Sequence, residues 1–226
     1  MHDDVIFNRK NWGNILLKQF KNTDYGILGL AGTTDLIKDG NGIVQAWWAI
    51  KNRMVGRIRH EANEKVIDDF YSNRYDHPIQ VVCLDGVFVA VNRCRIKKPF
   101  DERFRGFHYY DVPFTFSNHL AGVKVGVTFD IDLTHKSGGN PDEKWHENRL
   151  LFSKIYGSTI PCGIRPKQVD YDSSIIKKFN PTNYFVSIII PSRDKIDLVT
   201  DCIKSIIDHT HVAQYEIIIA DTGSTI

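Results

Sequence analysis

The sequence lacks the features that mark several classes of protein. It contains only four cysteines in 226 residues, at positions 83, 94, 162 and 202, and none has the CxxC spacing of a thiolate metal site. We therefore expect buried free thiols in a reducing cytosol rather than disulfides. No run of about 18 apolar residues is long enough to span a membrane, and no signal-peptide pattern is visible. With a net charge of +2 and no long basic run, the chain shows no pattern typical of nucleic acid binding.

What is present predicts a mixed α/β fold. Hydrophobic residues make up 42% of the chain, which is enough to bury a core. Apolar runs predict strands at residues 25–31, 79–84 and 87–91, and a mostly extended segment at 123–135. Residues 111–122 predict a helix, because Pro113 falls in its first turn and Gly122 can close it. The segment 57–70 is polar and has no clear period, so it is assigned no element.

Residues 185–226 predict a strand–helix–strand unit. "FVSIIIP" and "YEIIIAD" are buried strand runs, and Cys202 and Ile206 recur on one face of the helix between them. Asp194 is the expected N-cap of that helix. Two parallel strands and one helix leave both edges of their sheet uncovered, so this unit needs further protein to pack against. The polar stretch before it, residues 158–184, has the composition of a linker.

These segments resemble the family 2 glycosyltransferases of GT-A fold. "VSIIIPSRDKIDLVTDCIKSIIDHTHVAQYEIIIADTGST" is similar to the strand, helix and strand that open the family, with Thr222 where a second Asp is usual. "HDDVIF" resembles its metal-binding DxD segment, "LDGVFVAVNR" a segment near the acceptor, "FDERFRGFHYYDVPFTFSNHLAGVKVGV" the segment of the catalytic acid, and "LTHKSGG" the late histidine segment. His2, Tyr110 and Pro113 stand where acids are usual.

The resemblance implies an incomplete GT-A fold, the Rossmann-like fold of nucleotide-diphospho-sugar transferases. Residues 1–157 would be the C-terminal part of one domain, residues 158–184 a linker, and residues 185–226 the truncated first βαβ unit of a second GT-A domain. Met1 is then expected to be an internal position of a longer protein. The chain alone is expected to be inactive for want of a nucleotide-binding half. A circular permutation would also join complementary pieces, but it would need a connection between "DTGST" and "HDD" that the chain does not have.

The same resemblance implies a set of site residues. The metal ligands would be Asp4, Asp3 and His135, with Asp4 as the first choice because neighbouring side chains on a strand point to opposite sides. Asp111 would be the general base, although its position also suits a helix cap. The substrate would contact Asp85, Gly86, Tyr109, Tyr110, Lys136 and Ser137, and the nucleotide of the second domain would contact Pro191, Ser192, Asp194 and Asp221. Asp85 could instead only form a turn, and the acidic cluster could be a solvated terminus.

The sequence therefore predicts a metal-dependent glycosyltransferase of hexosyltransferase type. Mn²⁺ or Mg²⁺ is the expected cofactor, because hard oxygen ligands and an occasional imidazole suit these ions. The resemblance implies a nucleotide-diphospho-sugar donor (a UDP-sugar above all), a glycan or other hydroxyl acceptor, and inversion at the sugar, in the setting of polysaccharide biosynthesis. A cytoplasmic location is expected, with membrane association only through other parts or partners. The alternative is an inactive GT-A module that binds carbohydrate or nucleotide as a scaffold, which the departures at Tyr110 and Pro113 motivate.

Overall fold

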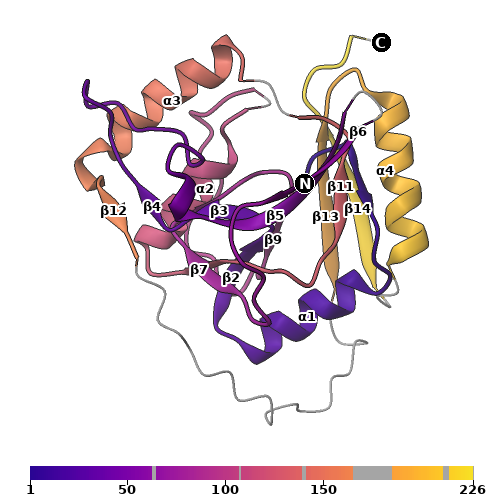
Figure 1. The fold of residues 1–226 in the computed structure, drawn as a ribbon. Coiled ribbons are helices and arrows are strands. Elements are labelled where there is room, and N and C mark those ends of the chain that lie inside the picture. Colours follow the sequence, from indigo (N-terminus) through magenta and orange to yellow (C-terminus); the bar gives the residue numbers. More distant parts are fainter. Residues whose placement is uncertain (63–64, 107, 139–140, 165–184, 211–213, 226) are drawn as a thin grey trace.

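The computed structural model of the chain contains both helices and strands and describes residues 1–62, 65–106, 108–138, 141–164, 185–210 and 214–225 (Figure 1). The α-helices are α1 (Trp12–Asn22), α2 (Asp111–Leu120), α3 (Glu143–Tyr156) and α4 (Ile196–His209), and short 3₁₀ helices lie at Lys51–Arg53 and Gly157–Thr159. The strands are β1 (Val5–Phe7), β2 (Tyr25–Gly29), β3 (Ala31–Thr33), β4 (Asp35–Leu36), β5 (Met54–Ala62), β6 (Lys65–Phe70), β7 (Ile79–Val81), β8 (Cys83–Leu84), β9 (Val89–Val91), β10 (Lys124–Val127), β11 (Leu133–His135), β12 (Cys162–Gly163), β13 (Val186–Ser192) and β14 (Tyr215–Asp221). The mixed α/β class predicted from the sequence is confirmed.

Two sheets form the body of the first part of the chain. The larger has the strand order β1-β11-β5-β3-β8, with β6 also paired to β5, and the smaller has the order β7-β10-β2-β9. The pairs β11–β5 and β10–β2 are parallel, and the other pairs in these sheets are antiparallel. Gly56 has a φ of 121°, and a Cβ there would collide with the carbonyl of Leu30. A glycine is therefore needed where β5 passes that backbone.

The predicted elements in this part are present, but several others were not predicted. The apolar runs at 25–31, 79–84 and 87–91 contain β2, β7, β8 and β9 and the first residue of β3. The predicted helix is α2, and Gly122 follows it with a φ of 82°. The segment that was assigned no element forms the antiparallel pair β5–β6. The sequence did not reveal it, because all of β6 is exposed or half-buried and its side chains show no burial pattern. Helices α1 and α3 were not predicted.

The C-terminal unit has the predicted strand–helix–strand form. β13 and β14 pair in parallel over their whole length, from Val186 opposite Tyr215 to the carboxyl ends of both strands. Cys202 and Ile206 of α4 are fully buried, as their spacing predicts. The predicted N-cap is wrong. Lys195 occupies that position, and Asp194 has a left-handed backbone (φ 52°) with its carboxylate turned to another loop.

This C-terminal unit packs on β1, at the side of the larger sheet (Figure 1). The backbone N–H of Phe7 donates to Oγ of Ser205 in α4 (2.7 Å), and both groups are buried. One hydrophobic core contains Phe7 and Trp12 from the first part together with Ile190 and Ile206 from the unit. The division into two domains stays a prediction, and residues 165–184 of the predicted linker lie outside the described residues. The structure adds that the two parts share a core.

The cysteines are free, as predicted. Cys83 and Cys202 are buried, whereas Cys162 is half-buried and Cys94 is exposed. Within the described part of the chain, no helix combines the length and the apolar character that crossing a membrane requires.

Candidate functional site

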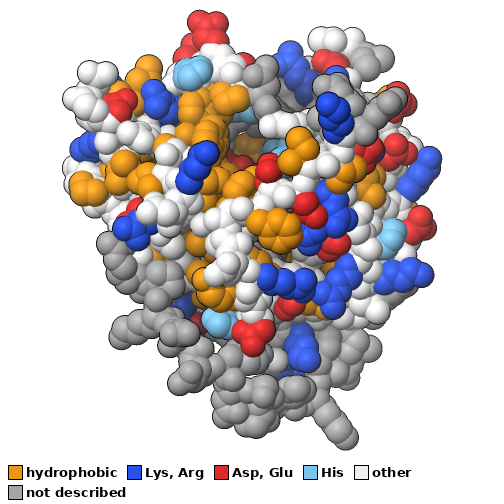
Figure 2. Space-filling view, in the orientation of Figure 1, with side chains coloured by type: hydrophobic (Ala, Val, Ile, Leu, Met, Phe, Trp, Pro, Cys, Tyr) orange, Lys and Arg blue, Asp and Glu red, His pale blue; other side chains and the backbone are white. Residues whose placement is uncertain are grey.

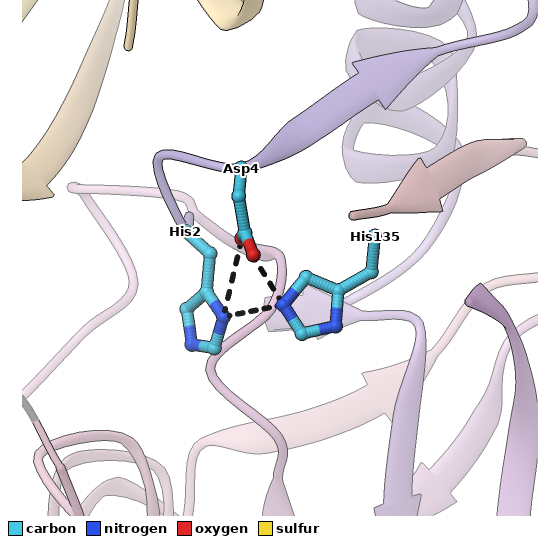
Figure 3. A group of neighbouring side chains, drawn as sticks. All are labelled: His2, Asp4 and His135. Atoms are coloured by element: carbon cyan, nitrogen blue, oxygen red, sulfur yellow. Dashed lines mark hydrogen bonds and ion pairs between the residues drawn. The ribbon is translucent and has the colours of Figure 1, made fainter. Parts of the chain in front are cut away.

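Three side chains with cation-binding atoms meet where β1 begins (Figure 3). Nε2 of His135 lies 3.1 Å from Nδ1 of His2 and 3.1 Å from Oδ1 of Asp4. Nδ1 of His2 lies 4.0 Å from that Asp4 oxygen. β11 pairs with β1 so that Val5 lies opposite His135, and the N–H of Lys136 donates to the carbonyl of Asp4 (2.8 Å). Strand pairing therefore joins residues that are 133 positions apart in the sequence.

His2 and Asp4 are in the protonation states that bind metal ions. Burial lowers the pKa of His2 to about 3, and the neighbouring His135 acts in the same direction, so the His2 ring is neutral at pH 7. Burial opposes ionisation of Asp4, but His135 and Ser137 outweigh it and hold the pKa of that carboxyl below its usual value. Asp4 and His135 are only 8% and 4% exposed. A neutral imidazole and an ionised carboxylate are the protonation states that metal binding requires.

The geometry of the three donor atoms fits a divalent cation. Two ligands at right angles on an ion, each at about 2.1 Å, lie about 3.0 Å apart. Two of the three separations here are 3.1 Å, and all three donor atoms lie within 4.8 Å of one another. Among the described residues, no group donates a well-aligned hydrogen bond to the buried Oδ1 of Asp4. The cluster could therefore hold a cation through two imidazoles and one carboxylate.

Asp3, predicted as a second carboxylate ligand, points away from this cluster. Its Oδ2 accepts a hydrogen bond from Oγ of Ser192, at the carboxyl end of β13 (2.7 Å). Asp3 and Asp4 lie in a bend just before β1, and Asp4 faces His135 while Asp3 contacts Ser192. Asp3 is 5% exposed, and burial raises its pKa although the Ser192 hydroxyl opposes the rise. Asp3 therefore joins the C-terminal unit to the cluster instead of adding a ligand.

A second pair of acids, Asp85 and Asp111, lies in the turn after β8 and at the start of α2. The backbone N–H of His2 donates to the carbonyl of Val87 (3.1 Å), which places the turn at Asp85 beside the cluster. Oδ1 of Asp85 accepts from the N–H of Val87 (2.9 Å), so this carboxylate does form the predicted turn. Burial and, second, the Asp85 carboxylate raise the pKa of Asp111 to about 7. Asp111 is the first residue of α2. Because of its raised pKa, it titrates near neutral pH, where a general base is most effective.

Gly86 lets Tyr110 and Asp111 approach this turn closely. A Cβ at Gly86 would lie 3.0 Å from Oδ2 of Asp111 and 3.0 Å from the hydroxyl of Tyr110. The Tyr110 hydroxyl donates a long hydrogen bond to the carbonyl of Gly86 (3.5 Å). Burial raises the pKa of Tyr110 well above its ordinary value, so its hydroxyl stays neutral. The predicted residues Asp85, Gly86, Tyr110 and Asp111 therefore form one side of the site.

Tyr109, predicted to touch substrate, lies in the core instead. It is 5% exposed and has a φ of 67°, which turns its side chain away from that of Tyr110. Its ring packs edge-on against Trp145 and Phe152 of α3, with centroids 5.3 and 5.7 Å apart. Because so little of the side chain reaches solvent, the structure favours a packing role for Tyr109.

Lys136 and Ser137 lie at the rim of the cluster. Nζ of Lys136 forms an ion pair with Glu61 (2.7 Å), and Oγ of Ser137 lies 3.2 Å from Nε2 of His135. A Cβ at Gly138 would meet nothing within 4 Å, so the backbone is open there. The segment therefore presents a positive charge and accessible backbone beside the cluster, as a phosphate-binding turn does.

A hollow opens on this side of the molecule (Figure 2). Acidic and histidine side chains are visible inside it, and hydrophobic side chains line part of its rim. It lies close to the chain start marked in Figure 1, where the cluster of His2, Asp4 and His135 is built.

Comparison with known families gives the class of protein. Residues 1–156 match the model of a family described as a glycosyltransferase-like family, which covers more than half of the chain. The chain belongs to this family. No curated protein and no solved structure matches it. The resemblance to family 2 glycosyltransferases is confirmed, and the mixed α/β structure with its curled sheet is compatible with a GT-A-like fold.

The C-terminal unit of this glycosyltransferase-like chain lies outside the family match. The residues predicted to bind a nucleotide there, Pro191, Ser192, Asp194 and Asp221, all lie at or just after the carboxyl ends of β13 and β14. Ligands of open α/β sheets bind at the carboxyl ends of parallel strands. Ser192 contacts Asp3, so these strand ends adjoin the first part of the chain. The sequence predicts a separate domain for these residues, and the structure shows that Ser192 contacts Asp3, the residue next to Asp4 of the cluster.

Sequence reasoning missed two histidines of this glycosyltransferase-like site. His2 stands at the first position of the segment that resembles DxD, so its place in that motif was a usable signal, whereas the chain bends at Asp3 and Asp4 and has no strand period there. His60 lies behind His135, with 3.3 Å between their Nδ1 atoms. Its segment shows no periodicity, and the pairing of β5 with β11 could not be read from the sequence.

Proposed function

We propose that the chain is a metal-dependent, inverting glycosyltransferase. It transfers a hexose from a nucleotide-diphospho-sugar, a UDP-sugar above all, to a hydroxyl group of a glycan acceptor. The observation that carries the proposal is that Tyr110 interacts electrostatically both with Asp4, in a cation-binding cluster (His2, Asp4 and His135), and with Asp111, whose pKa is about 7. Membership of the glycosyltransferase-like family supports the reaction class.

Asp111 is the proposed general base. Its carboxylate accepts the proton of the acceptor hydroxyl while that oxygen attacks the sugar from the side opposite the diphosphate, and a single displacement of this kind inverts the anomeric carbon. A pKa of about 7 leaves Asp111 basic enough to take the proton and largely ionised just above neutral pH. Asp85 and Tyr110, which flank it, are placed to bind sugar hydroxyls by accepting and donating hydrogen bonds.

His2, Asp4 and His135 are the proposed ligands of the cation. A divalent ion bound there would neutralise the charge that develops on the leaving diphosphate. Two imidazole ligands favour Mn²⁺ over Mg²⁺, because Mg²⁺ prefers a shell of oxygen atoms. Lys136 and the open backbone at Gly138 are placed to bind phosphate oxygens.

The C-terminal βαβ unit is the proposed nucleotide-binding wall of this same site. The sequence predicts that residues 1–157 lack such a half and that the chain alone is inactive. The hydrogen bond from Ser192 to Asp3 and the shared core support a different proposal, in which the carboxyl ends of β13 and β14 hold the nucleotide beside the cation.

Calorimetric titration of the chain with MnCl₂, and then with UDP, tests this function. We expect Mn²⁺ binding to the unaltered chain and UDP binding that requires Mn²⁺. Asp4→Ala removes a ligand and should weaken Mn²⁺ binding by about 100-fold. Asp101→Ala removes a carboxylate that pairs with Arg103 outside the cluster and should leave binding unchanged. Equal Mn²⁺ affinity in Asp4→Ala and the unaltered chain would contradict the proposal.

A second candidate function is an inactive module that binds carbohydrate. Tyr110 favours it, because a neutral phenol stands where the family resemblance leads one to expect an acid. Such a module would bind oligosaccharide equally well with MnCl₂ and with EDTA, and it would release no UDP from UDP-sugars. Metal-dependent UDP release that is lost in Asp111→Asn would decide for the enzyme.

A further inference from the structure

His60 lies on the far side of the His135 ring from the cluster. β5 and β11 pair in parallel with His60 opposite His135, so both side chains rise from the same face of the sheet. Their Nδ1 atoms are 3.3 Å apart, and their ring centroids are 5.3 Å apart. We propose that His60 is a positioning residue that orients His135 for the cation. This inference rests on the proposed metal-dependent function.

The two nitrogens of His135 have separate tasks in this arrangement. Nε2 points at the cluster, 3.1 Å from atoms of both His2 and Asp4. A cation bound to Nε2 needs its lone pair, so the ring must carry its single proton on Nδ1. His135 is 4% exposed, and a buried N–H without an acceptor destabilises the fold. Nδ1 of His60 is in reach to accept that hydrogen bond.

His60 can accept only if its own proton lies on Nε2. That nitrogen is 3.8 Å from Oδ2 of Asp69 on β6, which stabilises a proton there. Nδ1 of His60 also lies 2.9 Å from the carbonyl oxygen of Ser137, which can only accept a hydrogen bond. When His135 does not bind a cation, His60 can therefore donate from Nδ1 to Ser137. When His135 donates to His60, that bond to Ser137 is lost.

The two hydrogen bonds of His60 are thus mutually exclusive. A cation held at Nε2 of His135 would favour the His60 tautomer with its proton on Nε2, in which the carbonyl of Ser137 loses its hydrogen bond from His60. The segment affected is Lys136 to Gly138, whose backbone is open at its end. His60 therefore couples occupancy of the cation site to the hydrogen bonding of the Ser137 carbonyl, in the turn (residues 136–138) that is proposed to bind phosphate.

Binding of MnCl₂ by variants of the full chain tests the positioning role. His60→Leu removes the acceptor and should weaken Mn²⁺ binding by about 10–100-fold. His60→Asn offers an amide oxygen near the place of Nδ1 and should restore the affinity to within about threefold of the unaltered chain. His146→Leu, at an exposed histidine of α3, is the control and should bind Mn²⁺ normally. Circular dichroism of each variant checks that it is folded.

Nitrogen NMR of histidine-labelled, unaltered chain gives a readout that does not depend on any variant folding. Addition of ZnCl₂, a diamagnetic probe, should change Nδ1 of His60 from a protonated to an unprotonated signal. An unchanged His60 tautomer, or equal Mn²⁺ affinity in His60→Leu and the unaltered chain, overturns the positioning role alone. Failure of the unaltered chain to bind Mn²⁺ or Zn²⁺ overturns the proposed function as well.

Discussion

Replacing Asp85 by asparagine should lower the pKa of Asp111 and move the pH dependence of sugar transfer with it. Burial and the Asp85 carboxylate together raise the pKa of Asp111 from 3.8 to about 7, and burial is the larger cause. Asp85 is therefore the second contribution to the rise, which backbone hydrogen bonds to Asp111 partly offset. We expect Asp85→Asn to lower the Asp111 pKa to about 6, which corresponds to about 1.4 kcal/mol less penalty on the charged form.

The assay is the pH profile of UDP release in the presence of MnCl₂ and an acceptor. Asp111 must be ionised to accept a proton, so activity rises with pH through its pKa, and the midpoint of that limb should fall from about 7 to about 6 in Asp85→Asn. The midpoint is independent of any loss of maximal rate through weaker sugar binding. Asp101→Asn, which neutralises a carboxylate paired with Arg103, should leave the midpoint in place. A limb that stays near pH 7 in Asp85→Asn would refute the electrostatic reasoning.

The stability of the chain follows the same group with a definite sign. The folded-state pKa of Asp111 is raised, so the neutral form stabilises the fold at low pH, and this contribution is lost as pH rises from about 4 to about 7. Asp111→Asn removes the penalty of a buried charge. It should therefore gain stability over the unaltered chain across this range, by about 2 kcal/mol at pH 8 in urea unfolding once coupling to Asp85 is allowed for. If Asp111→Asn differed from the unaltered chain by the same free energy of unfolding at pH 4 and at pH 8, the raised pKa of the buried Asp111 carboxyl would be contradicted.

Two further predictions concern packing. Ser205→Ala leaves the buried N–H of Phe7 without its acceptor and should cost about 1–3 kcal/mol in urea unfolding, whereas Thr200→Ala, which removes an exposed hydroxyl bonded within α4, should cost less than about 0.5 kcal/mol. Gly56→Ala should cost at least about 2 kcal/mol, because its φ of 121° and the adjacent backbone exclude a Cβ, whereas Gly40→Ala, with open space around the new Cβ, should be nearly neutral in thermal unfolding.

The sequence was informative where local pattern decides the structure. The C-terminal strands are continuous apolar runs, and the helix between them repeats its buried residues at Cys202 and Ile206, so the unit could be predicted without knowledge of its surroundings. Pro113 fits the first turn of α2, and Gly122, which has a positive φ, follows shortly after the helix ends. In each case residues close together in the sequence were enough to predict the element.

Elements that depend on distant partners could not be predicted. β6 exposes Val66, Ile67 and Phe70, so it shows no alternation and is held by its pairing with β5. α1 does repeat Trp12, Leu16 and Phe20 at four-residue spacing, but it starts at Asn11 in a left-handed conformation without a side-chain cap, so its start signal was absent.

The candidate site divides in the same way. Strand alternation favoured Asp4 over Asp3, and Asp4 does lie in the cluster, but the chain bends at both residues before β1 begins, so alternation is not the cause. His60 and the place of Ser192 could not be deduced, because they follow from the pairing of β5 with β11 and from the packing of the C-terminal unit. Tertiary contacts, not local sequence, set these positions.

The position of the C-terminal unit has an energetic consequence for the cation site. β1 has only three residues, pairs with β11, and is packed against α4. The cluster at its start is therefore held in part by the contacts of Phe7 with Ser205 and of Asp3 with Ser192. A ligand that binds only the assembled cluster stabilises that assembly by about 2.7 kcal/mol at a concentration 100 times its Kd. Binding of a cation at the proposed site and packing of the C-terminal unit on β1 thus stabilise each other. The carboxyl ends of β13 and β14, proposed to bind nucleotide, are then held more firmly beside β1 when the cation is bound.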